Sequence, residues 1–170
     1  MALEAARKDG QTVTPQGEVV GQNRIDGVRI APLNPILTRG GATVESYRAD
    51  GPFAGFDVKQ VNYCPLRPGF ASDWHMHRIQ NDVIIPLSGE VHVGLFDDRE
   101  GSPTYGKSLL LRISPLRMAA VLVPCGVWHA LKNPDNAPAA YIVLNDQLYR
   151  HADPDDWRLK QDEPALHGIL

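Results

Sequence analysis

The chain has 170 residues, a formal net charge of −3 and an isoelectric point near 6.0. Its hydrophobic share of 43% and charged share of 22% are ordinary for one globular domain. A nucleic-acid-binding protein usually carries a basic surface, so the acidic balance argues against that class. The longest apolar runs are far too short to cross a bilayer, and no signal-peptide pattern opens the chain. We therefore expect a cytoplasmic protein that binds neither membrane nor nucleic acid, with Cys64 and Cys125 reduced.

Residues 1–24 are polar and weakly patterned, and we expect a flexible N-terminal arm that includes a short helix over Ala2–Lys8. Residues 25–170 are expected to form one β-barrel domain. Across the chain, 15 glycines and 14 prolines are scattered, which favours brief strands joined by turns over long helices. The predicted strands are Gly27–Ile30, Ala42–Arg48, Phe56–Tyr63, Asp73–His77, Val83–Leu87, Glu90–Phe96, Ser108–Ile113, Ala119–Val123, Trp128–Lys132 and Ala139–Asn145.

The hydrophobic patterns of these strands indicate how they pack. Val91, Val93 and Leu95 alternate with less apolar residues, which predicts a strand with one buried face. Val83–Ile85 is apolar on both faces, as expected for a strand covered by a second sheet. Short strands without helix-length patterns between them predict an antiparallel sandwich or barrel. Only near the end does a helix start signal occur, with Asp153 as the cap and a proline after it.

Three of the six histidines fall where they can meet. His75 and His77 are two residues apart on a predicted strand, so their side chains leave the same face. Asp82 follows after a short connection, and His129 returns from a distant strand. A lone pair of strand histidines is more often two polar groups on a wet face. Imidazole nitrogens together with a carboxylate, however, suit a borderline divalent metal, with Fe(II) favoured and Mn, Ni, Co or Zn as alternatives.

The first half of this pattern resembles a motif of the cupin superfamily. The spacing Gly69-x5-His75-x-His77-x4-Asp82-x6-Gly89 is similar to the first cupin motif, with Asp where that family usually has Glu. All its fixed positions are filled once this exchange is allowed.

The second half resembles the second cupin motif. It reads Pro124-x-Gly126-x2-His129-x3-Asn133, with Met118 at the place of the leading glycine. Two motifs in the right order make a strong match.

The cupin resemblance implies both a fold and a metal site. The fold is an all-β, single-domain antiparallel double-stranded β-helix, also called a jelly roll. The metal ligands are the residues at the motif positions: His75, His77, Asp82 and His129. Because Asp is one methylene shorter than Glu, Gln80, Asn81 or a water is an alternative to Asp82.

Stretches outside these motifs resemble one branch of the superfamily, the dTDP-4-dehydrorhamnose 3,5-epimerases. The likeness spans roughly residues 25–165. The matching stretches are Thr38–Gly40, Glu45–Tyr47, Gly89–Val91, Asp97–Gly106, the turn from Pro124 to His129, and Asp153–Trp157.

The epimerase resemblance implies a reaction without a metal. In that family a histidine removes a proton next to a ketone, a lysine helps to hold the enolate, and a tyrosine returns a proton from the other face. His75 or His77 would then be the base and Tyr141 the acid. The lysine position falls on Asp82, a reversal of charge, and the alignment places Ile142 at the tyrosine position. The chain therefore resembles the epimerases along most of its length. At several positions of their acid and base residues, however, it has the metal-ligand pattern instead.

Three functions follow from these patterns. The leading hypothesis is a metal-dependent cupin enzyme that acts on a small carbonyl or hydroxy substrate as an oxygenase, isomerase or lyase. The second is a metal-independent sugar-nucleotide epimerase or isomerase. The third is a non-catalytic cupin that binds a ligand. Under each of them we expect a homodimer, because the edges of a jelly roll need cover and residues 1–30 are candidates for strand exchange.

Overall fold

The structure is a computed structural model that describes residues 10, 11, 15, 24–159, 166 and 168–170. Most of the predicted N-terminal arm, including the helix over Ala2–Lys8, lies outside the described residues. Within the described residues there are twelve strands and no α-helix. No helix in this part of the chain is long and apolar enough to span a membrane.

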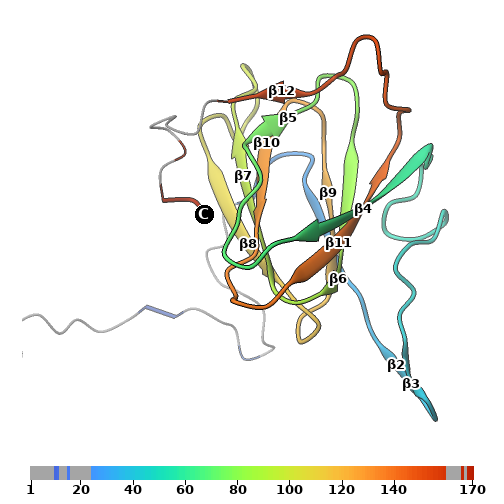
Figure 1. Cartoon of the computed structure of the whole chain (residues 1–170). Coiled ribbons are helices and arrows are strands. Elements are labelled where there is room, and N and C mark those ends of the chain that lie inside the picture. The colour runs from blue at the N-terminus through green and yellow to red at the C-terminus, as the bar shows by residue number, and fades with distance from the viewer. Residues whose placement is uncertain (1–9, 12–14, 16–23, 160–165, 167) are drawn as a thin grey trace, which may run out of the picture.

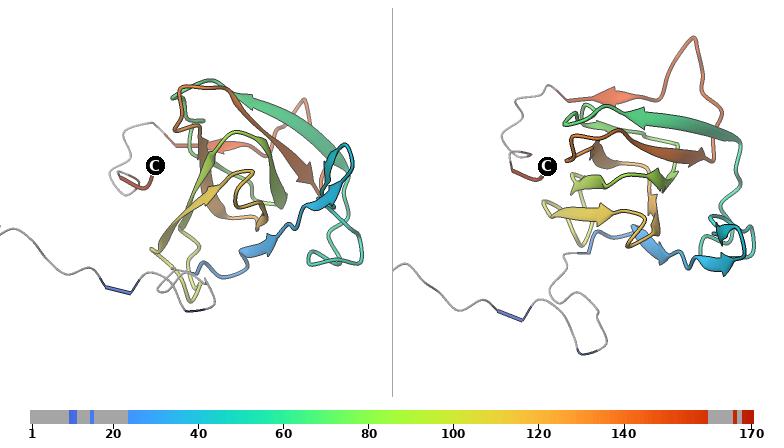
Figure 2. Two further views of the ribbon diagram at one scale, coloured as in Figure 1. Left: turned by 90° about the horizontal axis from the view of Figure 1, so that it is seen from below. Right: turned by 60° about the horizontal axis from the view of Figure 1, so that its bottom comes forward.

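Two five-stranded antiparallel sheets face each other and form a barrel (Figures 1 and 2). The first sheet has the order β1-β9-β6-β11-β4, and the second has the order β12-β5-β10-β7-β8. The strands of the first sheet are β1 (Arg29–Pro32), β9 (Ala119–Val123), β6 (Asp82–Ser88), β11 (Ala139–Asn145) and β4 (Gln60–Leu66). Those of the second sheet are β12 (Trp157–Arg158), β5 (His75–Met76), β10 (Val127–Lys132), β7 (Val91–Asp97) and β8 (Ser108–Ile113). This confirms the predicted all-β jelly roll.

The main hydrophobic core fills the space between the two sheets. Val91, Val93 and Leu95 of β7 are fully buried in it, which confirms the predicted alternation. They pack with residues of the facing sheet such as Ile84 and Val121. Burial of side chains of this size supplies the main driving force for closing the barrel, about 1.5–3 kcal/mol for each.

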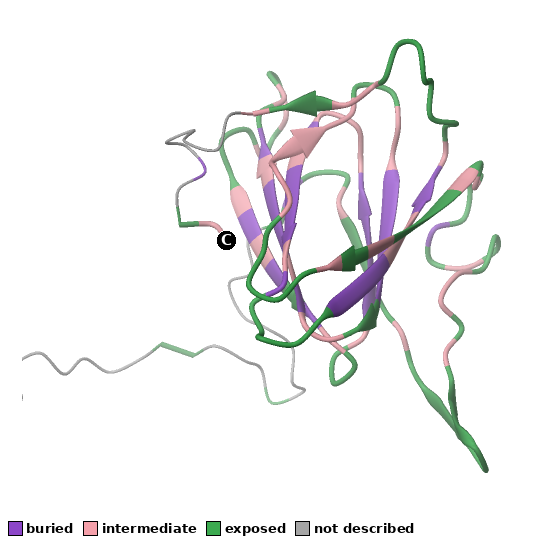
Figure 3. Ribbon diagram, in the orientation of Figure 1, coloured by how far each residue is buried: buried purple, intermediate pink, exposed green. Residues whose placement is uncertain are grey.

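A second core covers the outer face of the first sheet. Figure 3 colours most of β6, in the middle of that sheet, as buried. Val83 and Ile85 of β6 are buried there under Phe53 and Phe56. The prediction that this strand is covered on both faces is therefore correct. Its outer cover, however, is the loop of residues 44–58, which contains no strand.

A hairpin of β2 (Ile36–Thr38) and β3 (Gly41–Thr43) projects from the barrel (Figure 1). Among the described residues its strands pair only with each other, and Leu37 is 85% exposed. The predicted strand over Ala42–Arg48 ends at Thr43, because the following residues turn toward the outer core.

The helix predicted to start at Asp153 does not form within the described residues. Instead, Trp157 and Arg158 pair with β5 as strand β12. The carboxylate of Asp155 accepts hydrogen bonds from the backbone N–H groups of Arg78 and Ile79. These tertiary contacts hold the segment against the barrel and override its local helix signal.

Candidate active site

Four side chains predicted from the sequence meet at one end of the barrel. His129 on β10 lies directly across from His75 on β5, with their ring centroids 4.1 Å apart. His77 follows β5, and its ring centroid is 5.6 Å from those of both other histidines. Asp82 begins β6 and places Oδ2 3.4 Å from Nε2 of His77 and 3.4 Å from Nε2 of His129. The strand pairing thus brings together residues that are more than fifty positions apart.

The turn before β10 fixes the height of His129 in the barrel. Its Gly126 has a φ of +80°, a conformation that suits glycine, and its N–H donates to the carbonyl of His77 at 2.6 Å. The N–H of Cys125 donates to Oδ1 of Asn81 at 2.9 Å. This turn therefore fastens β10 to the loop between β5 and β6. Cys125 contributes backbone here, in line with a structural role.

All three histidines present the same ring edge to the site. Nδ1 of His75 lies 3.0 Å from the carbonyl of Asp73, and Nδ1 of His129 lies 3.1 Å from that of Val127. Nδ1 of His77 is bonded to the carbonyl of Asp155. A carbonyl oxygen only accepts, so each Nδ1 carries a proton and each Nε2 faces the cluster. By distance alone the three rings could hold a metal ion, since their nitrogens lie within 4.8 Å of one another.

Asp82 is 4% exposed and is held by a chain of side-chain amides. Its Oδ1 accepts hydrogen bonds of 2.8 Å from Gln80 and from Asn145. Asn145 in turn accepts from Asn62, and Asn62 accepts from Gln60. Every donor in this chain points toward Asp82, which stabilises its negative charge.

The electrostatics of the cluster separate the two strand histidines. Burial lowers the pKa of His75 to about 3, and the neighbouring His129 acts in the same direction. Burial also disfavours the charge on His77, but interaction with the Asp82 carboxylate outweighs it and raises that pKa to about 8. Burial alone would raise the pKa of Asp82, yet His129 and His77 hold it well below its usual range. At neutral pH the cluster therefore contains a neutral His75 beside a His77–Asp82 ion pair.

The segment around Asp155 secures the His77 loop from the outside. Asp155 accepts from three consecutive backbone N–H groups of residues 78–80, at 2.8–3.3 Å. The guanidinium of Arg78 lies 3.6 Å from the centre of the Trp157 ring, a cation–π contact. We call Asp155–Arg158 the clasp, because it fixes the loop that carries His77.

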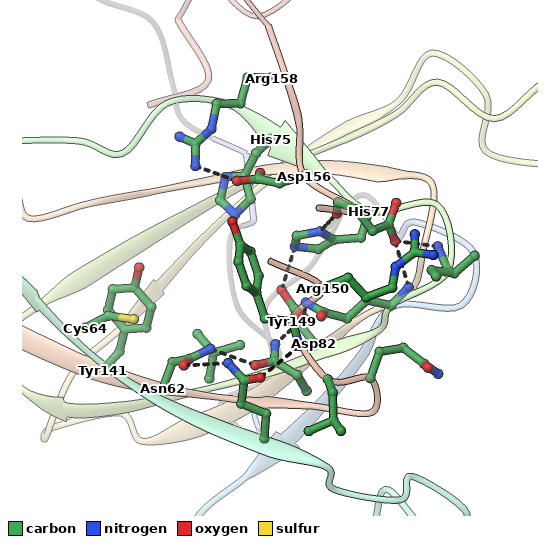
Figure 4. Close-up of a pocket in the computed structure, with 18 residues that line it drawn as sticks. Asn62, Cys64, His75, His77, Asp82, Tyr141, Tyr149, Arg150, Asp156 and Arg158 are labelled. Carbon is green, nitrogen blue, oxygen red and sulfur yellow. Dashed lines mark hydrogen bonds and ion pairs between the residues drawn. The ribbon is translucent and has the colours of Figure 1, made fainter. Parts of the chain in front are cut away.

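A pocket opens beside the cluster and is lined by His75, His77, Asp82 and two tyrosines (Figure 4). Tyr141 on β11 is 7% exposed and interacts with Cys64, and burial together with this thiol raises the pKa of its hydroxyl. Tyr149 lies on the loop after β11 and is 47% exposed. The sequence interpretation missed Tyr149, because nothing in a loop pattern indicates which way a side chain turns.

The sequence interpretation also missed the clasp and the amide chain. Both depend on contacts between residues far apart in the chain, such as Asn145 with Asp82 and Asp155 with the His77 loop. The only local signal was the resemblance of Asp153–Trp157 to an epimerase segment.

Comparison with known proteins identifies the family. The "Probable low-salt glycan biosynthesis epimerase Agl13" of Haloferax volcanii is 30% identical over 139 residues, which cover 81% of this chain and 89% of that protein. The chain belongs to the family of this epimerase. The spore coat polysaccharide biosynthesis protein SpsL of Bacillus subtilis is 26% identical over 142 residues, covering 84% of this chain and 93% of SpsL. No protein-family model matches the chain.

Solved structures with the same fold are sugar-nucleotide enzymes. A dTDP sugar isomerase from Desulfovibrio desulfuricans G20 has a TM-score of 0.77 at 24% identity, covering 84% of this chain and 90% of that one. ChmJ, a 3'-monoepimerase from Streptomyces bikiniensis solved with dTDP-quinovose, has a TM-score of 0.76 at 22% identity, covering 86% and 76%. These similarities confirm the jelly-roll fold of the epimerase family.

The family assignment corrects the leading hypothesis from the sequence. The relatives support an enzyme, but they contradict a metal-dependent oxygenase, isomerase or lyase. The predicted divalent metal cofactor, with Fe(II) favoured, is wrong for the same reason: the related epimerases act without a metal. The convergence of three imidazoles on a carboxylate therefore needs another explanation, and a network that gives His75 and His77 different protonation states provides it.

Proposed function

We propose that the protein is a metal-independent epimerase or isomerase of keto-sugar nucleotides in glycan biosynthesis. The observation that carries this proposal is a neutral histidine whose free nitrogen faces a polar pocket, in a chain of the epimerase family. The α-proton of a ketone leaves readily only when a base is in reach and the enolate is stabilised.

His75 is the better candidate for the base. The Nδ1–H of His75 is committed to the carbonyl of Asp73, and its Nε2 has no hydrogen-bond partner among the described residues. His77, by contrast, is engaged at both nitrogens, by the carbonyl of Asp155 and by the carboxylate of Asp82. A lone pair that is free in the resting enzyme can accept the substrate proton without first breaking an ion pair.

The charge reversal at Asp82 is compatible with an enolate. Asp82 is not a bare anion in the pocket, because His77 and two amides surround its carboxylate. The cation that the related epimerases take from a lysine is supplied here by protonated His77, whose pKa is about 8. A positive charge next to the reacting carbon stabilises negative charge as it develops.

The pocket suits the sugar part of such a substrate. Its volume of 210 Å³ is smaller than the ~300–1,000 Å³ of pockets that enclose a whole drug-sized ligand. Side-chain amides of Gln60, Asn62 and Gln80 line it and can bond sugar hydroxyls. The nucleotide would then lie toward the mouth, where Arg150 and Arg158 line the pocket.

The test is exchange of the proton next to the ketone. The protein is incubated in D₂O with a dTDP-linked 4-keto-6-deoxyhexose, and deuterium uptake is measured by mass spectrometry and NMR. We expect uptake and a new epimer, both unchanged by EDTA, and a loss of about 100-fold or more in His75→Gln. The matched control is His92→Gln, since His92 pairs with Glu90 away from the pocket. No uptake with dTDP-, UDP- or GDP-linked substrates, or activity lost to EDTA, would contradict the proposal.

We further propose that the protein acts in the cytoplasm as a homodimer. Free thiols at Cys64 and Cys125 are consistent with a reducing compartment. The projecting β2–β3 hairpin exposes the apolar side chains of Ile36 and Leu37. Burial of these side chains against a second copy of the chain would stabilise a dimer.

A further inference from the structure

The amide chain formed by Gln60, Asn62 and Asn145 extends from Asp82 to the loop after β11. At its outer end the backbone N–H of Tyr149, on that loop, donates to Oε1 of Gln60 at 2.9 Å. Nε2 of Gln60 donates to Asn62 at 3.0 Å, and Nδ2 of Asn62 donates to Asn145 at 2.8 Å. Nδ2 of Asn145 then donates to Oδ1 of Asp82 at 2.8 Å. A continuous line of hydrogen bonds thus joins a loop at the mouth of the pocket to a buried carboxylate (Figure 4).

The two ends of the amide chain permit only one direction of its hydrogen bonds. At the inner end the ionised carboxylate of Asp82 only accepts, and at the outer end the backbone N–H of Tyr149 only donates. Each side-chain amide has one accepting oxygen and one donating nitrogen, so each must turn its nitrogen toward Asp82 to satisfy both of its neighbours. If one amide turned over, two oxygens would face each other and the next amide would have to turn as well.

The first sheet holds these amides at fixed separations. Asn145 on β11 lies across from Gln60 on β4 and from Asp82 on β6. Gln60 and Asn62 are two residues apart on β4, so their side chains leave the same face of the strand. Asn145 is 3% exposed, and water therefore cannot readily replace the hydrogen bond that it donates to Asp82.

The amide chain also divides the two oxygens of Asp82 between different partners. Oδ1 accepts from Asn145 and from Gln80. Oδ2 lies 3.4 Å from Nε2 of both His77 and His129. Rotation of the carboxylate would break both amide bonds, so the amides fix which oxygen Asp82 presents to His77.

We propose that Asn62 and Asn145 are positioning residues that couple the loop at the mouth of the pocket to Asp82. They act through Asp82, which holds His77, the cation of the proposed reaction. When the loop is seated on Gln60, the amide chain is complete and the carboxylate is held in one orientation. This inference rests on the proposed function, because it concerns the turnover of the same site.

The test reverses the amide chain at the end that is far from Asp82. Gln60→Glu keeps the acceptor for the N–H of Tyr149 but replaces the donor toward Asn62 by an acceptor. Asn62 and Asn145 must then turn over, which places an amide oxygen against the Asp82 carboxylate. Gln60→Met removes the donor without forcing this reversal. Gln147→Glu, at an exposed position of the same loop outside the amide chain, measures the effect of the added charge alone.

Deuterium uptake from D₂O by the dTDP-linked 4-keto-6-deoxyhexose gives kcat and KM for each variant. In Gln60→Glu we expect kcat to fall about 30-fold or more while KM stays within about 3-fold of wild type. In Gln60→Met and in Gln147→Glu we expect kcat to fall less than about 5-fold. Equal losses in Gln60→Glu and either of the other two variants would overturn the proposal. A change confined to KM would also overturn it, because that result indicates a contact with the sugar.

A spectroscopic measurement tests the amide chain without any turnover. In nitrogen-15-labelled protein free of substrate, we expect Gln60→Glu to shift the side-chain NH₂ signals of Asn145 and to speed their exchange with D₂O. Unchanged Asn145 signals would reject the coupling, whereas absence of deuterium uptake in the wild type would reject only the proposed function. Thermal melting checks the fold of each variant. If Gln60→Glu does not fold, Asn62→Asp and Asn62→Leu give the same comparison, because Asp accepts from both neighbours and also reverses Asn145.

Discussion

The His77–Asp82 pair is the charged part of the cluster. Asp82 is buried, and an unpaired carboxylate there would be costly, so His77 and the amides of Gln80 and Asn145 all serve to keep it ionised. In turn Asp82 keeps His77 protonated, whereas burial keeps the neighbouring His75 neutral. Burial of one ring and the carboxylate beside the other thus separate the charge states of two histidines that lie only two positions apart in the chain.

This pair predicts how stability depends on pH. The pKa of His77 is raised from 6.5 to about 8, so its contribution is fully present below pH 6.5 and is lost as the pH rises through 8. We expect the free energy of unfolding in urea to fall by about 2 kcal/mol between pH 6.5 and pH 9. His77→Gln should abolish this fall, whereas His151→Gln, at an exposed position, should keep it. An identical pH profile in wild type and His77→Gln would contradict the assignment.

The sequence predicted which residues gather at the site better than it predicted what they do. His75, His77, Asp82 and His129 meet because the strand pairing places His129 across from His75. Their chemistry depends on hydrogen bonds that no spacing reveals, such as the engagement of each Nδ1 by a carbonyl. The same nitrogen geometry suits a metal ligand and a general base, which is why the motif alone favoured the wrong cofactor.

At the scale of elements, strands inside the barrel were predicted well and those outside it were not. The bounds of β8, β9 and β11 agree with the sequence prediction, because apolar runs there end at clear turns. All residues of the β2–β3 hairpin are exposed. Its sequence therefore shows no alternation of apolar and polar residues from which the two strands could be predicted. Strand β12 was taken for a helix start, since its structure is set by β5 and the His77 loop rather than by its own residues.

The turn before β10 offers a test of how one element positions the site. A Cβ at Gly126 would lie 2.8 Å from Cδ of Arg99, whose guanidinium is held by Asp97 and by the carbonyl of Asp26. Gly101 has a similar φ of +82° but open space around it. Gly101→Ala should cost about 1–2 kcal/mol for the left-handed backbone. Gly126→Ala should cost about 3 kcal/mol or more, because the Arg99 contacts are also disturbed.

Urea unfolding and deuterium uptake would be measured for both glycine variants. We expect uptake to fall only in Gly126→Ala, since that turn is bonded to His77 and leads into His129. Equal losses of stability and uptake in the two variants would show that the turn does not position the site.

At the scale of the whole molecule, we expect the proposed dimer to form through the projecting β2–β3 hairpin. Leu37 is 85% exposed at this projection, and apolar side chains of this kind are buried when two copies associate. Leu37→Asp should convert a dimer into a monomer in size-exclusion chromatography with light scattering. Leu116→Asp is the control, because Leu116 is 99% exposed on the turn between β8 and β9. A wild-type monomer, or a dimer that survives Leu37→Asp, would argue against association through the hairpin.

The clasp has a consequence for the order in which the site is assembled during synthesis. Asp155 lies 77 residues after Arg78, and strand β11 is complete at Asn145. A ribosome releases chains from the N-terminus, so every strand of the first sheet is available before the clasp emerges. The loop that carries His77 gains its last anchors only when Asp155–Arg158 appears. Translation that stops between these points would leave a nascent barrel with all strands of its first sheet present and the loop that carries His77 unfastened.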